Sequence, residues 1–248
     1  MSRGLGDVYK RQPREVGVTV SVRRKPTGTL GVKKRRLRKG TRVHRDEVLE
    51  TGRRGQAEFQ LDDHTKLALG PRARLKLDEF VVPEAATGAT AVSLNLVRGT
   101  FRFITGLMKS ESYRIVTPSA TMGIRGTVFD VYVDRRGDTL VLLHEGEVEI
   151  CSTTGACRRH NSVGRIIHTT VAGVISAPIK FAASLIPGLT VARAFPFVGR
   201  RRVVDPVRRL RRAGLVGKSA AKPVRRAGTV IREGTRTIGR TVRKLSPF

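Results

Sequence analysis

Short apolar segments follow one another at close intervals along most of this sequence, separated by turns rich in Gly, Asp and Pro. They lie at residues 57–61, 66–69, 74–77, 93–97, 100–104, 113–116, 128–133, 139–143, 147–150 and 165–169. A first strand is expected upstream, at residues 16–22, where four valines alternate with polar or small residues. Strands so closely spaced argue against the strand–helix alternation of a parallel α/β fold. The pattern predicts an all-β domain built as a sandwich, a barrel or a solenoid.

The core of such a domain must be built from Val, Leu, Ile and a few Phe residues. The 248-residue chain has no Trp, three Tyr and nine Phe. Its length allows one folded domain with a sizeable core. Residues 83–90, a Pro-, Gly- and Thr-containing stretch, are expected to form a flexible surface insertion within that domain.

One segment, residues 115–131, has the character of a motif. A strand is followed by Gly123, Ile124, Arg125, Gly126 and Thr127, and a second strand resumes before Phe129. The two glycines supply backbone freedom, which predicts a sharp turn that holds the Arg125 guanidinium at a fixed place beside the sheet. That group could grip an external carboxylate, but a structural role is favoured, in which it pairs inside the fold with Glu145 or Asp130.

This motif, followed by a strand and Gly146, resembles the FecR domain of bacterial periplasmic regulators. Weaker matches occur in the family's order at residues 37–40, 47–52, 57–63, 67–70 and 96–102. The resemblance covers roughly residues 17–178. The chain departs from the family in the acidic turn, where Asp62, Asp63, His64 and Thr65 stand in place of a glycine-containing turn; Asp or His tolerates the left-handed conformation expected there. The resemblance implies a β-solenoid-like winding or a wound antiparallel sandwich.

Four regions are expected along the chain. Residues 1–12 resemble a non-native leader and are excluded from the fold. Residues 13–178 are the β domain, residues 179–198 an apolar connecting segment and residues 199–248 an Arg-rich tail, either disordered or partly helical. The connecting segment carries charges, Pro and Gly and is too short and broken to span a bilayer, so it is expected to pack on the domain or lie on a membrane surface.

The formal net charge of +29 favours polyanionic partners such as nucleic acid, anionic lipid or acidic polysaccharide, although a solvated basic surface would show the same excess. One basic cluster is expected on an exposed loop and the other in the tail. The anion-binding candidates are Lys33, Lys34, Arg35 and Arg36, and Arg200, Arg201, Arg202, Arg208, Arg209, Arg211 and Arg212.

Cys151 and Cys157, the only cysteines, bracket a turn-rich loop that would place two hairpin strands side by side. A disulfide is geometrically reasonable there and would indicate an oxidising compartment. Two reduced thiols and a partial zinc site are the alternatives. No metal site is predicted, because zinc normally takes four ligands and neither His144 nor His160 has a convincing ligand spacing.

No arrangement of residues points to catalysis or to a cofactor. The five histidines are scattered, and no nucleophile elbow or phosphate-cradling loop is present. Asp62, Asp63 and His64 favour a solvated turn over an acid–base site. Together with this, the FecR resemblance implies a non-enzymatic, periplasmic or secreted FecR-like binding and signal-relay module, with an envelope protein or an anionic polymer or lipid surface as the expected partner and no small-molecule substrate.

Two other functions remain open at this point. One is an electrostatic nucleic-acid-binding protein, which would bind without sequence preference because stacking aromatics are missing among the basic residues. The other is a structural envelope protein that holds anionic lipid or polysaccharide through its tail. Family members that act as anti-sigma factors carry an N-terminal sigma-binding segment and a membrane helix, and neither is visible in this sequence.

Overall fold

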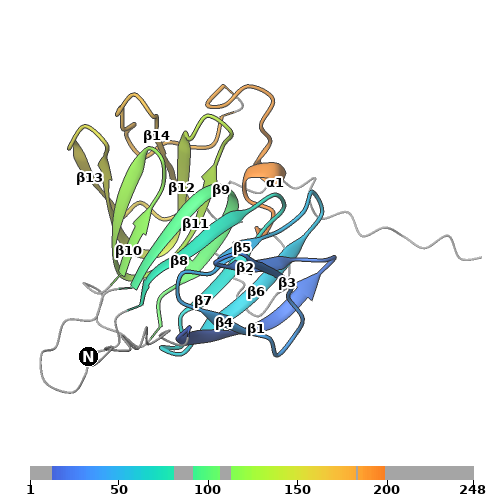
Figure 1. The fold of residues 1–248 in the computed structure, drawn as a ribbon. Helices are drawn as coiled ribbons and strands as arrows, with labels where there is room; N and C mark the ends of the chain where they lie inside the picture. Colours follow the sequence, from blue (N-terminus) through green and yellow to red (C-terminus); the bar gives the residue numbers. More distant parts are fainter. Residues whose placement is uncertain (1–12, 81–91, 107–112, 183, 199–248) are drawn as a thin grey trace, which may run out of the picture. The chain divides into compact units, whose positions relative to one another are not determined.

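The computed structural model describes residues 13–80, 92–106, 113–182 and 184–198. The expected leader, the insertion at residues 83–90 and the whole of the tail, with its seven arginine candidates, therefore lie outside the described residues. The regular secondary structure of the described part is almost entirely strand, with one short helix, α1 (Val191–Ala194), so the all-β prediction is confirmed (Figure 1). No helix in this part is long and apolar enough to cross a membrane.

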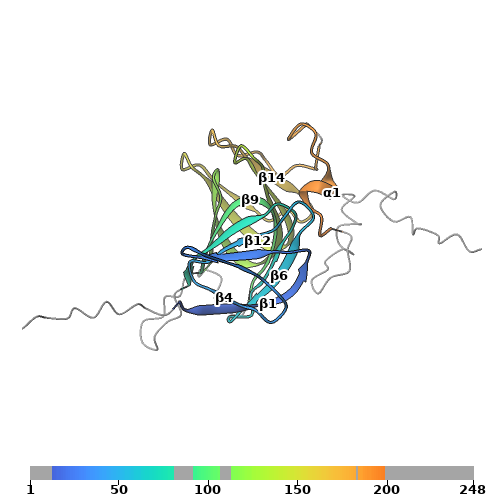
Figure 2. The same cartoon turned by 45° about the vertical axis from the view of Figure 1, so that its right-hand side comes forward.

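Fourteen strands of the described chain join into one sheet. They are β1 (Glu15–Arg23), β2 (Thr27–Leu30), β3 (Lys33–Arg36), β4 (Arg42–His44), β5 (Val48–Glu50), β6 (Gln56–Leu61), β7 (Lys66–Leu69), β8 (Arg74–Phe80), β9 (Val92–Ile104), β10 (Tyr113–Val116), β11 (Ala120–Val133), β12 (Thr139–Ser152), β13 (Cys157–His160) and β14 (Ile166–Thr169). The main path runs β13-β12-β11-β10-β9-β7-β6-β1-β4. Only β9 and β10 pair in parallel among the described strands, and the other pairings are antiparallel. Figure 2 shows β12 and β9 on one part of this sheet and β6, β1 and β4 on another.

Strand β9 links the two halves of the sheet, and it unites two segments that the sequence predicts to be separate strands. Its first half pairs with β8 and its second half with β7 and β11. Gly99 lies between them at φ +97°, where an added Cβ would overlap the backbone of Ala73. Glycine therefore lets the strand change partners without ending.

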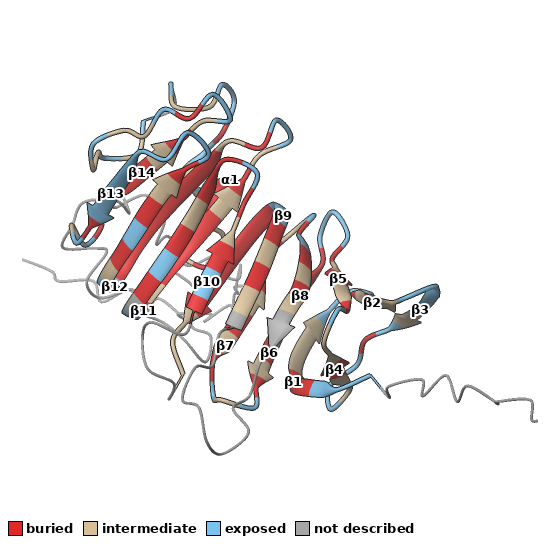
Figure 3. Ribbon diagram, turned by 60° about the vertical axis from the view of Figure 1, so that its left-hand side comes forward, coloured by how far each residue is buried: buried red, intermediate tan, exposed pale blue. Residues whose placement is uncertain are grey.

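The core lies on one face of the sheet, because alternate side chains of the strands point to it. Phe59, Phe101, Phe103 and Phe129 are among its largest fully buried side chains. The rings of Phe103 and Phe129 lie 5.5 Å apart, and Phe103 meets Tyr113 edge to face at the same distance. Figure 3 shows buried residues recurring along β9, β11 and β12.

The connecting segment packs on the other face of the sheet. Leu140, Leu142 and Ile166, from β12 and β14, form a second buried cluster with residues of the segment. Phe195 is fully buried in this cluster, and its ring lies 6.5 Å from that of Phe181. The segment therefore packs on the domain, which was one of its two expected placements. Its aromatic residues cover an apolar face of the sheet.

Candidate functional site: the paired glycine bulge and the buried charge cluster

The glycine–arginine motif does not form the predicted sharp turn. Ala120–Val133 is one continuous strand, β11, paired along its length with β12, and the register shifts between Arg125 and Phe129. Gly123 has no positive φ and pairs with Arg114 of β10. A bulge absorbs the extra residues while the hydrogen-bonded ladder continues on both sides, so the strand bends but does not reverse its direction.

Two glycines face each other across this bulge. Gly126 has φ +55° and Gly146, opposite it on β12, has φ +79°. A Cβ on Gly146 would overlap the carbonyl oxygen of Gly126, whereas a Cβ on Gly126 would meet nothing within 4 Å. Position 146 therefore requires glycine both because the Gly126 backbone lies so close and because its φ is positive. Position 126 favours glycine only because its φ is positive.

Hydrogen bonds to Thr105, just after β9, tie the bulge down. The Thr127 N–H donates to Thr105 Oγ1 over 2.9 Å, and the Thr105 N–H and hydroxyl both donate to the Thr127 carbonyl oxygen over 3.1 Å. Ile124 and Phe129, on either side of the bulge, are buried in the main core. The apolar residues of the motif thus belong to the core, and its glycines set the shape of the strand pair.

The backbone of Arg125 lies opposite Glu147, at the start of the bulge. Its side chain lies outside the described part of the structure, so its pairing with Glu145 or Asp130 stays a prediction. The Asp130 carboxylate has two described partners, Arg102 and His144.

Arg102, Asp130 and His144 form a charge cluster on the sheet face opposite the core. Asp130 stands in register with Arg102, and its carboxylate accepts from Arg102 Nε over 2.6 Å and from an Arg102 Nη over 2.8 Å. His144 Nε2 lies 3.1 Å from Asp130 Oδ2, the oxygen that also accepts from the Arg102 Nη. The side chains of Asp130 and His144 are fully buried, and that of Arg102 is 3% exposed. This bidentate pair is a buried ion pair with well-formed geometry.

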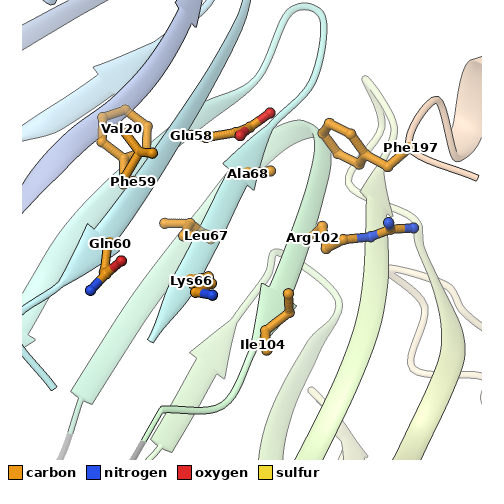
Figure 4. Close-up of a pocket in the computed structure, with 10 residues that line it drawn as sticks. All are labelled: Val20, Glu58, Phe59, Gln60, Lys66, Leu67, Ala68, Arg102, Ile104 and Phe197. Atoms are coloured by element: carbon orange, nitrogen blue, oxygen red, sulfur yellow. The ribbon is translucent and has the colours of Figure 1, made fainter. Parts of the chain in front are cut away.

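The connecting segment completes the cover over this cluster. The Arg102 guanidinium lies 5.5 Å from the centre of the Phe197 ring, which is itself buried. Figure 4 shows Phe197 and Arg102 side by side at one end of a small groove that also contacts Ala68 and Ile104. The cluster therefore couples three strands, β9, β11 and β12, to the segment that follows the domain.

The cluster gives stability a defined dependence on pH. Burial alone would raise the pKa of Asp130, but the positive charges of His144 and Arg102 outweigh it and hold this pKa below its usual value. A carboxyl group whose pKa is lower in the folded state than in the unfolded state stabilises the fold. This stabilisation is fully present at a pH above the unfolded-state pKa of about 3.9, and it is lost as the pH falls through the folded-state pKa. We expect the free energy of unfolding of wild type to exceed that of Asp130→Asn near neutral pH. The difference should shrink progressively below about pH 4 in urea titrations. A difference that stays constant down to about pH 3 would contradict this origin.

Part of the described sheet matches a known protein family. Residues 47–149 match the model of the family described as FecR protein. They form a FecR domain. The match spans β5 to most of β12, including the paired glycine bulge and the buried charge cluster. No curated protein matches the chain.

Two solved structures are similar to the chain, both crystal structures of a candidate anti-sigma factor from Parabacteroides distasonis, at 2.50 Å and 1.65 Å resolution. Each is 16% identical over 55% of this chain, with a TM-score of 0.43. The chain covers 61% of the length of that protein.

The basic cluster upstream of the FecR match lies on a strand instead of the predicted loop. Lys33, Lys34, Arg35 and Arg36 form β3, which pairs in the described chain with β2 alone. Alternation along a strand sends neighbouring side chains to opposite faces, so the four cations do not present one surface.

Arg35 is committed to the fold. It donates to both carboxylate oxygens of Glu47 over 3.0 Å and 2.8 Å, and to the Arg42 carbonyl oxygen. Glu47 is fully buried and also accepts from the His44 N–H over 2.9 Å. Arg35 therefore compensates a buried carboxylate, which removes it from the anion-binding candidates; Lys34 lies 3.4 Å from Glu50, and Lys33 and Arg36 remain exposed.

The acidic turn keeps the expected conformation without glycine. His64 adopts φ +67°, the left-handed region predicted for this turn. Asp63 accepts hydrogen bonds from the hydroxyls of Tyr113 over 2.6 Å and Thr65 over 2.7 Å. Burial, followed by the hydrogen bond to Asp63, raises the pKa of Tyr113 to about 12. Asp63 thus holds β10 against the turn, which is a structural role.

Cys151 and Cys157 are joined by a disulfide, with an S–S distance of 2.03 Å. They stand opposite each other in the β12–β13 hairpin. Its turn is closed by a hydrogen bond from the Ser152 N–H to the Ala156 carbonyl oxygen and by one from the Gly155 N–H to the Ser152 carbonyl oxygen, and Gly155 supplies a positive φ. The strand pairing predicted from the loop is therefore the geometry that brings the sulfurs together. In the described part of the chain, no three His, Cys, Asp or Glu side chains are grouped so as to hold a metal ion.

Replacing both cysteines with alanine is expected to lower the free energy of unfolding by about 2 kcal/mol, since the bond closes a short loop in the unfolded chain. Urea titration of the two proteins, with and without reductant, measures this. Reductant should lower the stability of wild type to that of the double variant and leave the variant unchanged. Equal stability of oxidised wild type and the variant would show that the bond adds nothing.

The buried charge cluster is the feature that sequence reasoning missed. Arg102 and Asp130 each stand between apolar residues of a strand, a position that usually faces solvent, and His144 ends a run of apolar residues. Opposite charges on two neighbouring strands were the available signal, but the pairing of β9 with β11 brings together residues far apart in the sequence.

Proposed function

We propose that this protein is a non-enzymatic binding and signal-relay module that works outside the bacterial cytoplasm. The observation that carries this proposal is the FecR match over residues 47–149. The disulfide supports the compartment, because disulfides persist in the periplasm and in secreted proteins and are rare in a reducing cytoplasm. The described polar clusters support a non-catalytic role, since Asp130, Glu47 and Asp63 are each occupied in holding strands together.

A relay module changes gene expression through a partner, so its loss has a transcriptional signature. The experiment is deletion of the coding sequence in the source bacterium, followed by RNA sequencing and complementation. Wild type should restore a defined set of transcripts. A variant whose FecR domain is unfolded, such as Gly146→Val, should not restore them, because an added side chain there overlaps the backbone of Gly126. A transcript profile unchanged by deletion under envelope stress would contradict a relay role.

A further inference from the structure

A large cleft lies at one end of the sheet, apart from the paired bulge and the basic strand β3. Its walls come from the turns before β6, before β8 and between β11 and β12, from the middle of β9, and from residues 185–196. The space that water-sized molecules can occupy measures about 1640 Å³ and is open to solvent. Small-molecule pockets are typically about 300–1,000 Å³ and largely enclosed, so this cleft suits a segment of a larger partner.

Six arginines line the cleft, against two aspartates. They are Arg53, Arg72, Arg98, Arg135, Arg136 and Arg193, and all six are exposed. No ion pair joins any of them to an acid within the described chain. Arginine presents a planar fork that binds carboxylates or phosphates through two hydrogen bonds, so six such groups in one cleft make an anion-binding surface.

Both aspartates of the cleft are occupied by backbone groups. Asp134 Oδ1 accepts from the N–H groups of Arg136, Gly137 and Asp138 over 2.7–3.0 Å. Asp138 Oδ1 accepts from the Val171 N–H over 3.0 Å. These carboxylates therefore shape the β11–β12 turn and leave the positive charge of the arginines in excess.

Three of the arginines act electrostatically on Tyr132, which also lines the cleft. Burial is the main cause that raises the pKa of this residue, with Asp134 acting in the same sense, while Arg193, Arg135 and Arg72 act in the opposite sense. These three residues come from three separate parts of the chain. Arg72 is also held at φ +57°, in the left-handed region that is uncommon for residues other than glycine, by a hydrogen bond from its N–H to the Gly52 carbonyl oxygen.

Apolar side chains lie between the cations. Val97, 39% exposed, is one of the few large apolar residues that the described chain leaves open to solvent, and Leu185 and Ile186 also line the cleft. Among the described residues of the lining, Tyr132 is the only aromatic one, so they provide no series of platforms on which nucleobases could stack. Carboxylates spaced between aliphatic side chains match such a surface better than a nucleic acid does.

We propose that this cleft binds an acidic, partly aliphatic peptide segment of a partner protein, with its carboxylates on the six arginines and its aliphatic side chains on Val97, Leu185 and Ile186. The inference rests on the proposed function only in taking the partner to be a protein. It differs from the anion-binding candidates of the sequence, none of which lies in the described lining of this cleft.

The test is photo-crosslinking of the full chain to a synthetic peptide of alternating glutamate and photo-leucine, mapped by mass spectrometry. Crosslinks should fall on the cleft lining, chiefly on Val97 and residues 185–187, and should weaken as salt is raised. An otherwise identical peptide with glutamine in place of glutamate should give few. Crosslinks confined to residues 199–248 or to β3 would overturn the proposal.

A charge-reversal pair makes the same test quantitative. Arg53→Glu, Arg98→Glu and Arg136→Glu in one chain should weaken peptide binding by about tenfold or more in fluorescence anisotropy. The matched control, Lys33→Glu, Arg36→Glu and Arg38→Glu, makes the same change of net charge outside the cleft and should weaken binding less than about threefold. An equal loss of peptide affinity in the two variants would overturn the proposal. So would single-stranded DNA that displaces the labelled peptide as effectively as the unlabelled peptide does. Either result leaves the transcriptional test of the relay role unaffected.

Discussion

Replacing Asp130 with asparagine is expected to lower the free energy of unfolding by about 3–5 kcal/mol. The change removes the charge on which Arg102 and His144 converge, at a position that is fully buried. Arg102 loses the Asp130 carboxylate, which accepts two hydrogen bonds from its guanidinium. The positive charge of Arg102 then stays buried at a site of low dielectric without its counter-charge. Chemical denaturation of the two proteins at neutral pH measures the loss.

Asp46→Asn is the matched control for this experiment. Asp46 is exposed and lies 3.6 Å from Arg45 and 3.9 Å from Lys76, so it also takes part in ion pairs. It has φ +62°, a conformation that asparagine also tolerates. Exposed ion pairs contribute about 0–1 kcal/mol, and this variant should lose no more than that. Equal losses in the two variants would show that burial of the Asp130 pair is energetically unimportant.

Gly146→Ala is expected to cost about 3 kcal/mol. Alanine in the left-handed conformation of Gly146 destabilises the fold by about 1–2 kcal/mol. The overlap of its Cβ with the Gly126 carbonyl oxygen adds a packing cost of similar size. Denaturant titration gives the free energy of unfolding. The bulge joins β11 to β12, so the substitution is expected to loosen this strand pair in the folded state. The variant would then expose less additional surface on unfolding, and its m value should be equal to or lower than that of wild type.

The other two glycines of the motif serve as controls of graded effect. Gly126→Ala should cost about 1–2 kcal/mol, because φ is positive but the space is open. Gly123→Ala should be neutral or stabilise by up to about 1 kcal/mol, because the residue is extended and exposed within a strand. A ranking in which Gly123→Ala costs as much as Gly146→Ala would contradict the bulge geometry and favour a turn at Gly123.

The sequence was sufficient to predict most strands, because alternating apolar residues and turn residues are local signals. It failed where one strand changes partners or bulges. Gly99, Gly126 and Gly146 each looked like an interruption, yet each lies inside a strand with a positive φ. A glycine alone does not distinguish a bulge from a turn, since the difference depends on whether the neighbouring strand continues beside it.

The candidate sites show the same limit. The candidate disulfide between Cys151 and Cys157 is confirmed, and it was within reach of the sequence because a turn of only five residues separates them, which makes their geometry local. Arg35 was taken for a surface cation because its partner Glu47 lies across a strand pairing that the sequence does not display. The arginines of the cleft are single residues in separate turns, so only the fold assembles them.

The proposal that this FecR domain works outside the cytoplasm predicts the state of the two cysteines in the living cell. Cells are quenched with acid and alkylated without reduction, and the envelope fraction is digested with trypsin. Residues 137–158 contain no Lys or Arg before Arg158, so both cysteines fall in one peptide. We predict an unalkylated peptide, two hydrogens lighter than its reduced form. A doubly alkylated peptide would mean two free thiols and would contradict an oxidising compartment.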